Sequence, residues 1–488
     1  MTRAAKKIRR RKFLGGAMAL GAAASLPAPA IAMSRLGSTR PNILVLVTDQ
    51  QLWTMMGCMG NAWLRTPAMD GLAASGMRFD LAYVTNPVCS PSRFSLQTGR
   101  MPSIVGTTEN GDAIAGDVPQ GILDTSLGPL FRRAGYDAVY GGKVHLARAF
   151  RDDFAGRSYR YFERDERDAL AQSCAAFLKE KHEKPFFLTA SLINPHDICF
   201  LAINAWRASR KLPRIFDGED TTLALMGEIA RKDRRKFVEE ECPPLPANHA
   251  IPELEPEAIA TKYLKPVGFR QYVRERWTEE DWRIHRWVYC RLTERVDREI
   301  ATVLDALREA GLERDTLVVL TSDHGDLAGA HKLEHKSVLY EEAMRVPFLV
   351  SQKGAIPEGR ADTSHLVSNG LDLLPTLCDW AGIALPDARY DGRSLAPLLR
   401  GEAPADWRRF LVVESQHDRM IRTERFKYCA YTTGAHREQL NDLEADPGEM
   451  ANLAERPEYA DTVRAHRDML RAWMFATWDY DFQAVTPY

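Results

Sequence analysis

Three continuous hydrophobic runs stand out along the chain, and each of them ends in polar residues. Unbroken runs of apolar and β-branched residues are typical of strands buried on both faces of a sheet. The runs are PNILVLVTD at 41–49, FFLTASLI at 186–193 and TLVVLTSD at 316–323. The polar residues at their carboxyl ends are Asp49-Gln50, Asn194-Pro195-His196 and Asp323-His324.

Helical periodicity lies between these runs. In the clearest stretch, apolar residues recur every three or four positions from Trp287 to Leu307, and Gly311 then stops the pattern. Strands that alternate with helices predict an α/β fold whose central, mostly parallel sheet is covered on both faces. Ligands of such sheets bind outside the carboxyl ends of the strands. We therefore expect the three polar clusters to form one site.

Two segments depart from this pattern. Residues 200–280 have mixed charge, several prolines and poor periodicity, which is typical of an insertion over the active face or, equally, of a solvated surface excursion. After about residue 385, short alternating runs indicate antiparallel strands, and a helix is expected at 457–473. The sequence thus predicts a catalytic domain at 41–384 and a small α+β subdomain at 385–488.

The N-terminus has the layout of an export signal. A basic run precedes an apolar stretch from Phe13 to Leu26, and an Ala-x-Ala sequence ends at Ala32, as in a signal peptide over 1–32. The Arg-Arg-Lys-Phe-Leu start resembles a twin-arginine signal, and the apolar stretch is shorter than the roughly 20 residues that span a bilayer. We expect a periplasmic or secreted protein without a stable membrane span. A lipid-tethered or uncleaved form remains the alternative.

Composition argues against some partners and chemistries. The chain has 65 basic and 66 acidic side chains, so no global positive field favours nucleic acid. Its eight cysteines include no Cys-x-x-Cys pair, which makes zinc and dithiol redox sites poor interpretations.

Cys89 opens the motif Cys-Ser-Pro-Ser-Arg, which continues as Ser-Leu-Gln-Thr-Gly-Arg to Arg100. A structural cysteine requires no such neighbours, and no Cys/His signature of a thiol protease surrounds it. The motif resembles the sulfatase signature Cys-x-Pro-x-Arg. In that family a formylglycine-generating or sulfatase-maturating enzyme oxidises the cysteine to formylglycine, whose hydrated aldehyde acts as a covalent nucleophile.

The resemblance also implies one divalent cation, which acts as a Lewis acid. Calcium is the expected ion, with magnesium or manganese as alternatives. Many sulfatases have two successive acids at the first ligand position, whereas this chain has Asp49 followed by Gln50. That combination resembles the branch of choline sulfatases and phosphonate monoester hydrolases. The implied metal ligands are Asp49, Gln50, Cys89, Asp323 and His324.

The same resemblance implies the catalytic and substrate-binding groups around the nucleophile. Arg93 of the signature holds the surrounding oxygens, and Lys143 and His145 match a Gly-Lys-x-His motif. In that motif the lysine contacts the diol or the sulfate, and the histidine is the base that breaks the hemiester. His196 corresponds to a histidine that binds sulfate and donates to the leaving group. Lys336, thirteen residues beyond Asp323, and Asn110, twenty-one beyond Cys89, match substrate-facing positions.

Two further histidines leave alternatives open. His331 and His335 flank Lys336 in sequence, so they either reach the substrate or pack within the loop.

The resemblance extends from Pro41 to about Asn452 and includes TSDHGDLAGAH, YEEAMRVPFLV and LNDLEADPGEMANL. It implies an alkaline-phosphatase-like α/β sandwich with a small C-terminal subdomain. The implied activity is sulfuric ester hydrolysis, with sulfated carbohydrate as the expected substrate and a small aryl, alkyl or choline sulfate as the alternative. A phosphonate monoester or phosphodiester hydrolase with the same nucleophile is one competing hypothesis. A noncatalytic binder of sulfated sugars, with Cys89 unmodified, is another.

Overall fold

The computed structural model describes residues 40–110, 118–146, 158–215, 221–386 and 390–477. The signal peptide expected at 1–32 lies outside these residues. Within the described part of the chain, no helix combines the length and the apolar character that crossing a membrane requires.

The central sheet has eight strands in the order β5-β4-β6-β1-β7-β8-β2-β9. β8 runs antiparallel to β7 and β2, and the other neighbours are parallel, which confirms the mostly parallel α/β sheet. The three strands expected from the hydrophobic runs form its centre as β6, β1 and β7. The strands are β1 (Asn42–Asp49), β2 (Met77–Phe79), β4 (Asp137–Gly142), β5 (Arg160–Glu163), β6 (Phe186–Pro195), β7 (Thr316–Ser322), β8 (Phe348–Ser351) and β9 (Arg360–Asp362).

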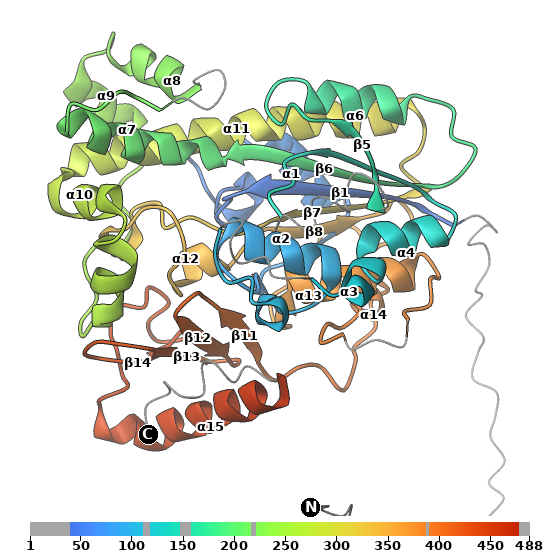
Figure 1. The fold of residues 1–488 in the computed structure, drawn as a ribbon. Helices are drawn as coiled ribbons and strands as arrows, with labels where there is room; N and C mark the ends of the chain where they lie inside the picture. The colour runs from blue at the N-terminus through green and yellow to red at the C-terminus, as the bar shows by residue number, and fades with distance from the viewer. Residues whose placement is uncertain (1–39, 111–117, 147–157, 216–220, 387–389, 478–488) are drawn as a thin grey trace, which may run out of the picture. The chain divides into compact units, whose positions relative to one another are not determined.

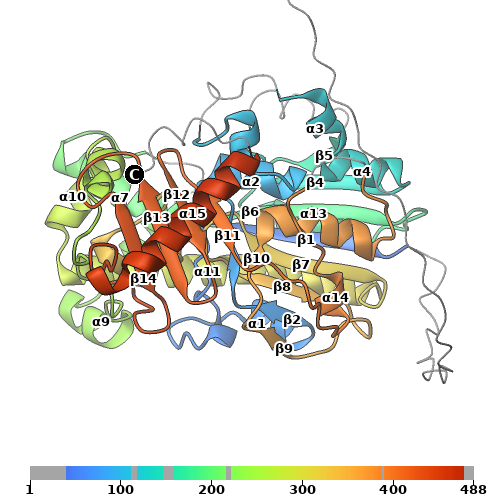
Figure 2. The same ribbon diagram turned by 90° about the horizontal axis from the view of Figure 1, so that it is seen from below.

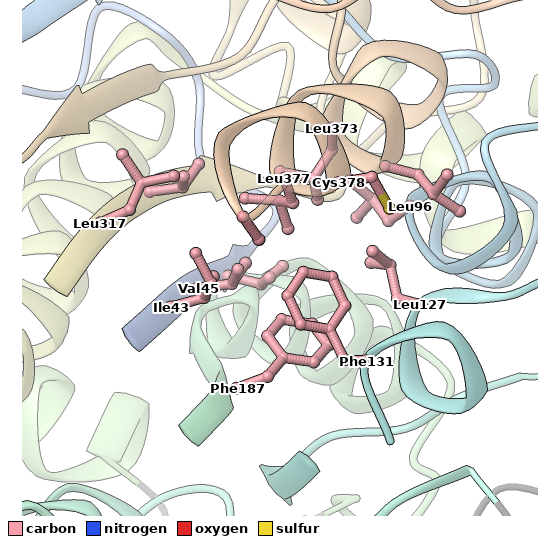
Figure 3. Close-up of a cluster of buried hydrophobic side chains, with 14 of the residues drawn as sticks. Ile43, Val45, Leu96, Leu127, Phe131, Phe187, Leu317, Leu373, Leu377 and Cys378 are labelled. Carbon is pink, nitrogen blue, oxygen red and sulfur yellow. The ribbon is translucent and has the colours of Figure 1, made fainter. Parts of the chain in front are cut away.

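Helices cover both faces of this sheet (Figure 1). On one face, Ile43 and Val45 of β1 pack with Leu317 of β7 against α2, α4 and α13, as Figure 3 shows. Leu44 and Leu46 point to the other face, where α1, α6 and α11 complete a second core. A run that is apolar at every position therefore buries both sides of one strand. The covering helices are α1 (Pro67–Ala74), α2 (Cys89–Thr98), α4 (Leu127–Arg133), α6 (Leu170–Leu178), α11 (Glu279–Glu309) and α13 (Asn369–Trp380).

The segment at 200–280 contains several short helices. α7 and α10 pack on each other, and Ala202, Val273 and Trp282 form a small core of their own. These helices are short, so the weak periodicity of the sequence did not predict them. They are α7 (Cys199–Ser209), α8 (Thr221–Ile229), α9 (Arg234–Glu241), a π-helical segment (Ile259–Leu264) and α10 (Gly268–Arg276).

A separate four-stranded antiparallel sheet and helix α15 follow near the C-terminus, as expected. α15 crosses one face of this sheet (Figure 2), where Val463 and Leu470 pack on Ile421 and Leu440. The other face packs on residues near Tyr340, so it supports the segment that follows Lys336. The domain boundary at 384/385 stays a prediction. The elements are β11 (Leu411–Glu414), β12 (Asp418–Arg422), β13 (Phe426–Tyr431), β14 (Glu438–Asp442) and α15 (Ala460–Thr477).

Short elements complete the described part of the chain. They are β3 (Ala82–Tyr83), β10 (Val367–Ser368), α3 (Gln120–Asp124), α12 (Glu341–Met344), α14 (Ala396–Leu399) and five 3-10 turns (Gly57–Met59, Pro102–Val105, His196–Ile198, Ala330–Lys332 and Pro457–Tyr459).

Candidate active site

The polar clusters predicted from the sequence meet at one edge of the sheet. In the parallel register, Thr48 of β1 lies beside Ser322 of β7, and Asp49 lies beside Pro195 of β6. Asp323 and His196, each the residue that directly follows its strand, are therefore brought next to Asp49. β4 ends at Gly142 on the same edge, so it adds Lys143 to the group.

Cys89 is the first residue of α2 and is 1% exposed. Its Sγ lies 3.1 Å from His324 Nε2 and 3.1 Å from Lys336 Nζ, with Asp49 Oδ1 at 4.0 Å. The N-terminal end of a helix carries partial positive charge, so α2 adds to the positive field at this sulfur. Asn110 supports the same turn, because its Oδ1 accepts a hydrogen bond of 2.9 Å from the backbone N–H of Ser90.

The electrostatic environment favours an anion at position 89. Burial and the Asp49 carboxylate both oppose ionisation of the thiol. Lys143, Lys336 and His324 nevertheless outweigh them and hold the pKa of Cys89 well below its usual range. A group that gains negative charge is therefore stabilised here by fixed cations.

Arg93, one turn further along α2, joins the two strand-end carboxylates. Its Nε donates to Asp323 Oδ2 at 2.8 Å, and its Nη2 donates to Asp49 Oδ2 at 2.8 Å. Its Nη1 donates to Ser191 Oγ at 2.7 Å and to the backbone oxygen of Lys143 at 3.1 Å. The rigid guanidinium fork thus connects the nucleophile helix to β1, β4, β6 and β7.

The pKa values of the two carboxyl groups, Asp49 and Asp323, are shifted in opposite directions. Burial opposes the charge of Asp49, but Lys143 and Arg93 hold its pKa well below the usual range. The Lys143 ammonium lies 2.7 Å from Asp49 Oδ2. For Asp323, burial and the neighbouring Asp49 carboxylate raise the pKa. Two carboxylates this close together repel each other even with Arg93 between them. A further positive charge beside them is therefore stabilised.

Gln50 and Lys336 meet beside the nucleophile. Lys336 Nζ donates to Gln50 Oε1 at 2.7 Å as well as to Cys89 Sγ. The other end of the amide, Gln50 Nε2, donates to Asp326 Oδ2 at 2.6 Å. The sequence did not single out Asp326, although it stands only three residues after Asp323.

The histidines differ in their placement. His196 is within electrostatic reach of Asp49, Lys143 and Lys336; burial, and then Lys143, hold its pKa well below the usual range. His145 is exposed, and no hydrogen bond joins it to another described residue. Its catalytic assignment therefore stays a prediction.

His331 and His335 follow the packing alternative. His331 is fully buried and stacks on Tyr340 with ring centroids 3.8 Å apart. His335 is 6% exposed, pairs with Glu334 and contacts the ring of Phe269.

The donor atoms suit a hard divalent cation. One ligand atom each from Asp49, Cys89, Asp323 and His324 lies within 4.8 Å of the others. Carboxylate oxygens are the ligands that calcium, magnesium and manganese prefer. The residues therefore fit a cation at the position that the sequence predicted.

A second group, His331, Glu342 and Glu449, also has metal-ligand spacing. The buried Lys427 ammonium, however, already pairs with Glu449, and its Nζ lies 3.6 Å from Glu341 Oε1. A side-chain cation of the protein thus compensates Glu449, whereas Glu342 Oε1 accepts from Asn248 Nδ2 at 2.7 Å.

Comparison with known proteins identifies the family. The pattern that describes the sulfatase family matches residues 41–383, about 70% of the chain. The chain belongs to the sulfatase family. A second pattern, described as N-sulphoglucosamine sulphohydrolase, C-terminal, matches residues 329–474 of this sulfatase.

Two relatives that resemble the chain over most of its length are named as sulfatases that act on different substrates. This sulfatase is 31% identical to the Δ4,5-hexuronate-2-O-sulfatase of Bacteroides thetaiotaomicron over 457 residues, which cover 88% of each protein. It is 28% identical to the choline-sulfatase of Rhizobium meliloti, with 91% of this chain and 88% of that protein covered.

Solved structures confirm the alkaline-phosphatase-like fold. A 2-O GAG sulfatase superposes with a TM-score of 0.76 at 29% identity, covering 92% of this chain and 94% of the other. The phosphonate monoester hydrolase of Agrobacterium radiobacter superposes with a TM-score of 0.69 at 21% identity, covering 90% and 96%.

Further contacts of Gln50 were also not visible from the sequence. Its backbone oxygen accepts from Tyr289 Oη at 2.6 Å, and the Cys199 thiol donates to its Oε1 at 3.1 Å. All eight cysteines are free thiols. Because Tyr289 and Cys199 are distant in sequence from Gln50 and have ordinary local patterns, no sequence signal connects them to the site.

Proposed function

We propose that this sulfatase is exported and cleaves the sulfate ester of a sulfated carbohydrate, with a formylglycine made from Cys89 and one divalent cation. The observation that carries the proposal is the position of Cys89 Sγ, 3.1 Å from both His324 Nε2 and Lys336 Nζ at the N-terminus of α2. Asp49 and Asp323 complete the donor set around it.

The reaction consumes one water and separates the ester into an alcohol and inorganic sulfate. A hydrated formylglycine at position 89 would supply a hydroxyl nucleophile, and a cation, which Asp49, Gln50, Asp323 and His324 would hold, would supply Lewis acidity. The chain's own contribution is to hold these groups rigidly, since Arg93 fixes both carboxylates by charge-assisted hydrogen bonds.

Two ammonium groups bind the sulfate. Lys143 and Lys336 both lower the pKa of the Cys89 side chain. Both ammonium groups therefore act at the position where the negatively charged sulfate group of the substrate binds. Burial opposes the charge of both lysines, but Cys89 and neighbouring acidic groups raise the pKa of Lys336 above the usual value, and Asp49 raises that of Lys143. Both lysines therefore stay positive at neutral pH, and preorganised charge of this kind lowers the barrier to S–O cleavage.

His196 faces the leaving group in this proposal. Its depressed pKa keeps the imidazole neutral at neutral pH, so it assists by donating a hydrogen bond from a ring N–H to the ester oxygen. His145 is assigned as the base that releases sulfate from residue 89, and Asn110 keeps the first turn of α2 in place.

The substrate class rests on the relatives and on the N-terminus. The relative with 31% identity acts on 2-O-sulfated Δ4,5-hexuronate, which supports an acidic sugar sulfate as substrate. The signal-like residues 1–32 support export to the periplasm or beyond, where such saccharides occur. The oxidation of Cys89 requires a formylglycine-generating or sulfatase-maturating enzyme as a partner.

The test is to produce the protein with and without a formylglycine-generating enzyme and to measure the mass of the peptide that contains residue 89. The matured protein should carry an aldehyde there and release sulfate from sulfated disaccharides and 4-nitrophenyl sulfate. Choline sulfate is assayed beside them as the alternative substrate. Faster hydrolysis of a phenylphosphonate monoester would favour the phosphonate alternative. An unmodified thiol in protein from its native host, with sugar binding but no turnover, would favour the binding protein.

A further inference from the structure

Arg270 is a positive side chain that the sulfatase chemistry does not use. It lies on α10, in the segment between 200 and 280, and its Nη2 donates to Ser337 Oγ at 3.3 Å. Ser337 directly follows Lys336, and its backbone N–H donates to the oxygen of Pro87, two residues before Cys89. The guanidinium is thus held beside the loop that carries Lys336 and beside the start of the nucleophile helix.

This guanidinium has no anionic partner among the described residues. Glu334 and Asp326 affect it electrostatically, but neither lies within ion-pair distance. Its Nε is buried and donates to no acceptor among the described residues, and its Nη1 donates to the backbone oxygen of Tyr263 at 3.5 Å. Burial lowers the pKa of Arg270, which means that its charge is under-compensated.

Arg270 and Ser337 are both partly exposed, so a ligand can reach them. Ser337 also has a backbone φ of 84°, a strained conformation for a residue with a side chain. Strain of this kind persists where the surrounding structure fixes a group for function. The Ser337 hydroxyl accepts from Arg270 and keeps its own proton available for a substrate oxygen.

We propose that Arg270, supported by Ser337, binds the carboxylate of a sulfated uronic acid and selects acidic sugar sulfates over neutral ones. This inference rests on the proposed sulfatase function and names the part of the substrate beyond the sulfate. The planar guanidinium fork matches a carboxylate, and desolvation strengthens the pair. Lys143 and Lys336 hold the sulfate while Arg270 holds the second anion, so the sugar is fixed at two points.

The packing of α10 makes this position rigid. Gly268 lies against Trp206 of α7, where an added Cβ would be 3.2 Å from the indole ring. The ring of Phe269 contacts His335, one residue before Lys336, with centroids 4.9 Å apart. The insertion is therefore joined on one side to the helix that follows His196 and on the other to the Lys336 loop.

The experiment compares two substrates on the matured enzyme: an unsaturated disaccharide with a 2-O-sulfated hexuronate, and the same compound with its carboxyl group reduced to an alcohol. We expect the wild type to favour the carboxylate form. In Arg270→Gln, the ratio of the two kcat/KM values should fall by about tenfold to a hundredfold, the usual effect of losing one charge-assisted hydrogen-bonded pair. Arg270→Lys, which keeps the charge without the fork, should give an intermediate ratio.

Arg276→Gln is the matched control, because Arg276 is an exposed arginine on the same helix, and its ratio should stay at the wild-type value. Binding of both disaccharides to Cys89→Ala and to Cys89→Ala/Arg270→Gln, measured by calorimetry, provides a readout that does not depend on turnover. A wild-type ratio near one, or an Arg270→Gln ratio equal to that of the wild type, overturns the inference. A preference for a second sulfate without one for the carboxylate overturns it as well. Failure of the matured wild type to hydrolyse any sulfate ester would instead overturn the proposed function.

Discussion

Asp326 accepts a hydrogen bond of 2.6 Å from the side-chain amide of Gln50 and thereby fixes which end of that amide faces the nucleophile. The amide oxygen is directed to Lys336 because the nitrogen is occupied by this carboxylate. Asp326 is held in turn by the backbone N–H of Ala328 at 2.6 Å. A glutamine serves as a metal ligand only through its oxygen, so this contact decides whether Gln50 can bind a cation.

Asp326→Asn should therefore weaken cation binding. An asparagine can accept from or donate to the Gln50 amide, so that amide can turn its nitrogen toward the site. We expect the dissociation constant for calcium to rise by about tenfold or more, as is usual when a group that orients a ligand is removed. Calorimetric titration of the metal-free protein measures this, with the exposed Asp305→Asn on α11 as control. Equal affinities for wild type and Asp326→Asn would refute the role of this contact.

Arg93→Ala should destabilise the fold as well as the site. The substitution leaves Asp49 and Asp323 buried without the guanidinium that joins them, and Lys143 compensates only Asp49. Breaking a buried ionic network typically lowers the free energy of unfolding by about 3–5 kcal/mol. Denaturant unfolding monitored by circular dichroism measures this change. The exposed Arg235, which pairs with Glu239 on the surface, provides the control substitution Arg235→Ala, which should have no measurable effect. A stability loss no larger than that of the control would contradict the structural role of Arg93.

Ionisation of Glu334, in the loop that carries Lys336, should make the free energy of unfolding depend on pH. Burial raises the pKa of this carboxyl from its ordinary value of 4.5 to about 8, because the ionised form is poorly solvated. Because the pKa is higher in the folded state than in the unfolded state, Glu334 contributes fully to the free energy of unfolding below pH 4.5. This contribution is lost as the pH rises through about 8. Glu334→Gln cannot ionise, so its stability relative to wild type should increase across this window. Thermal unfolding at several pH values tests this, with exposed Glu458→Gln as control. A wild-type to variant difference that does not change with pH would contradict it.

Gly142 is a position where a side chain should disturb the site. It precedes Lys143, has a φ of 86°, and an added Cβ would lie 2.1 Å from the backbone oxygen of Ser191. Gly142→Ala should cost more than about 1 kcal/mol of unfolding free energy and shift Lys143 away from Asp49. Gly60→Ala is the matched control, because Gly60 also has a positive φ of 83° but no atom within 4 Å of the added Cβ. If the two variants lose the same stability in denaturant unfolding, the contact with β6 has no effect of its own.

The sequence predicted the centre of the sheet because β1, β6 and β7 are buried on both faces and are therefore apolar throughout. Their carboxyl ends indicated Asp49, Asp323 and His196 for the same reason. β4 has a shorter apolar stretch that ends in two glycines, so the position of Lys143 came only from the family resemblance. The resemblance also located Arg93, whose contacts join residues up to 230 positions apart and leave no local pattern.

Long-range contacts and short helices could not be predicted from the sequence. Asp326 and Gln50 are 276 residues apart, and nothing in the composition distinguishes Asp326 from other acids. Arg270 lies in a segment of short helices whose weak periodicity left its structure open. Its position beside Ser337 follows from packing between helices, which a single sequence does not specify.

The most direct test of the account is sulfate release from a 2-O-sulfated unsaturated hexuronate disaccharide by protein matured with a formylglycine-generating enzyme, compared with equally treated Cys89→Ala. Cys89 contributes one small buried side chain, so its truncation should leave the fold intact. The account predicts steady release of sulfate by the matured wild type and none by the folded variant. Release by Cys89→Ala at the wild-type rate would contradict the account, because the residue at position 89 would then have no part in the cleavage.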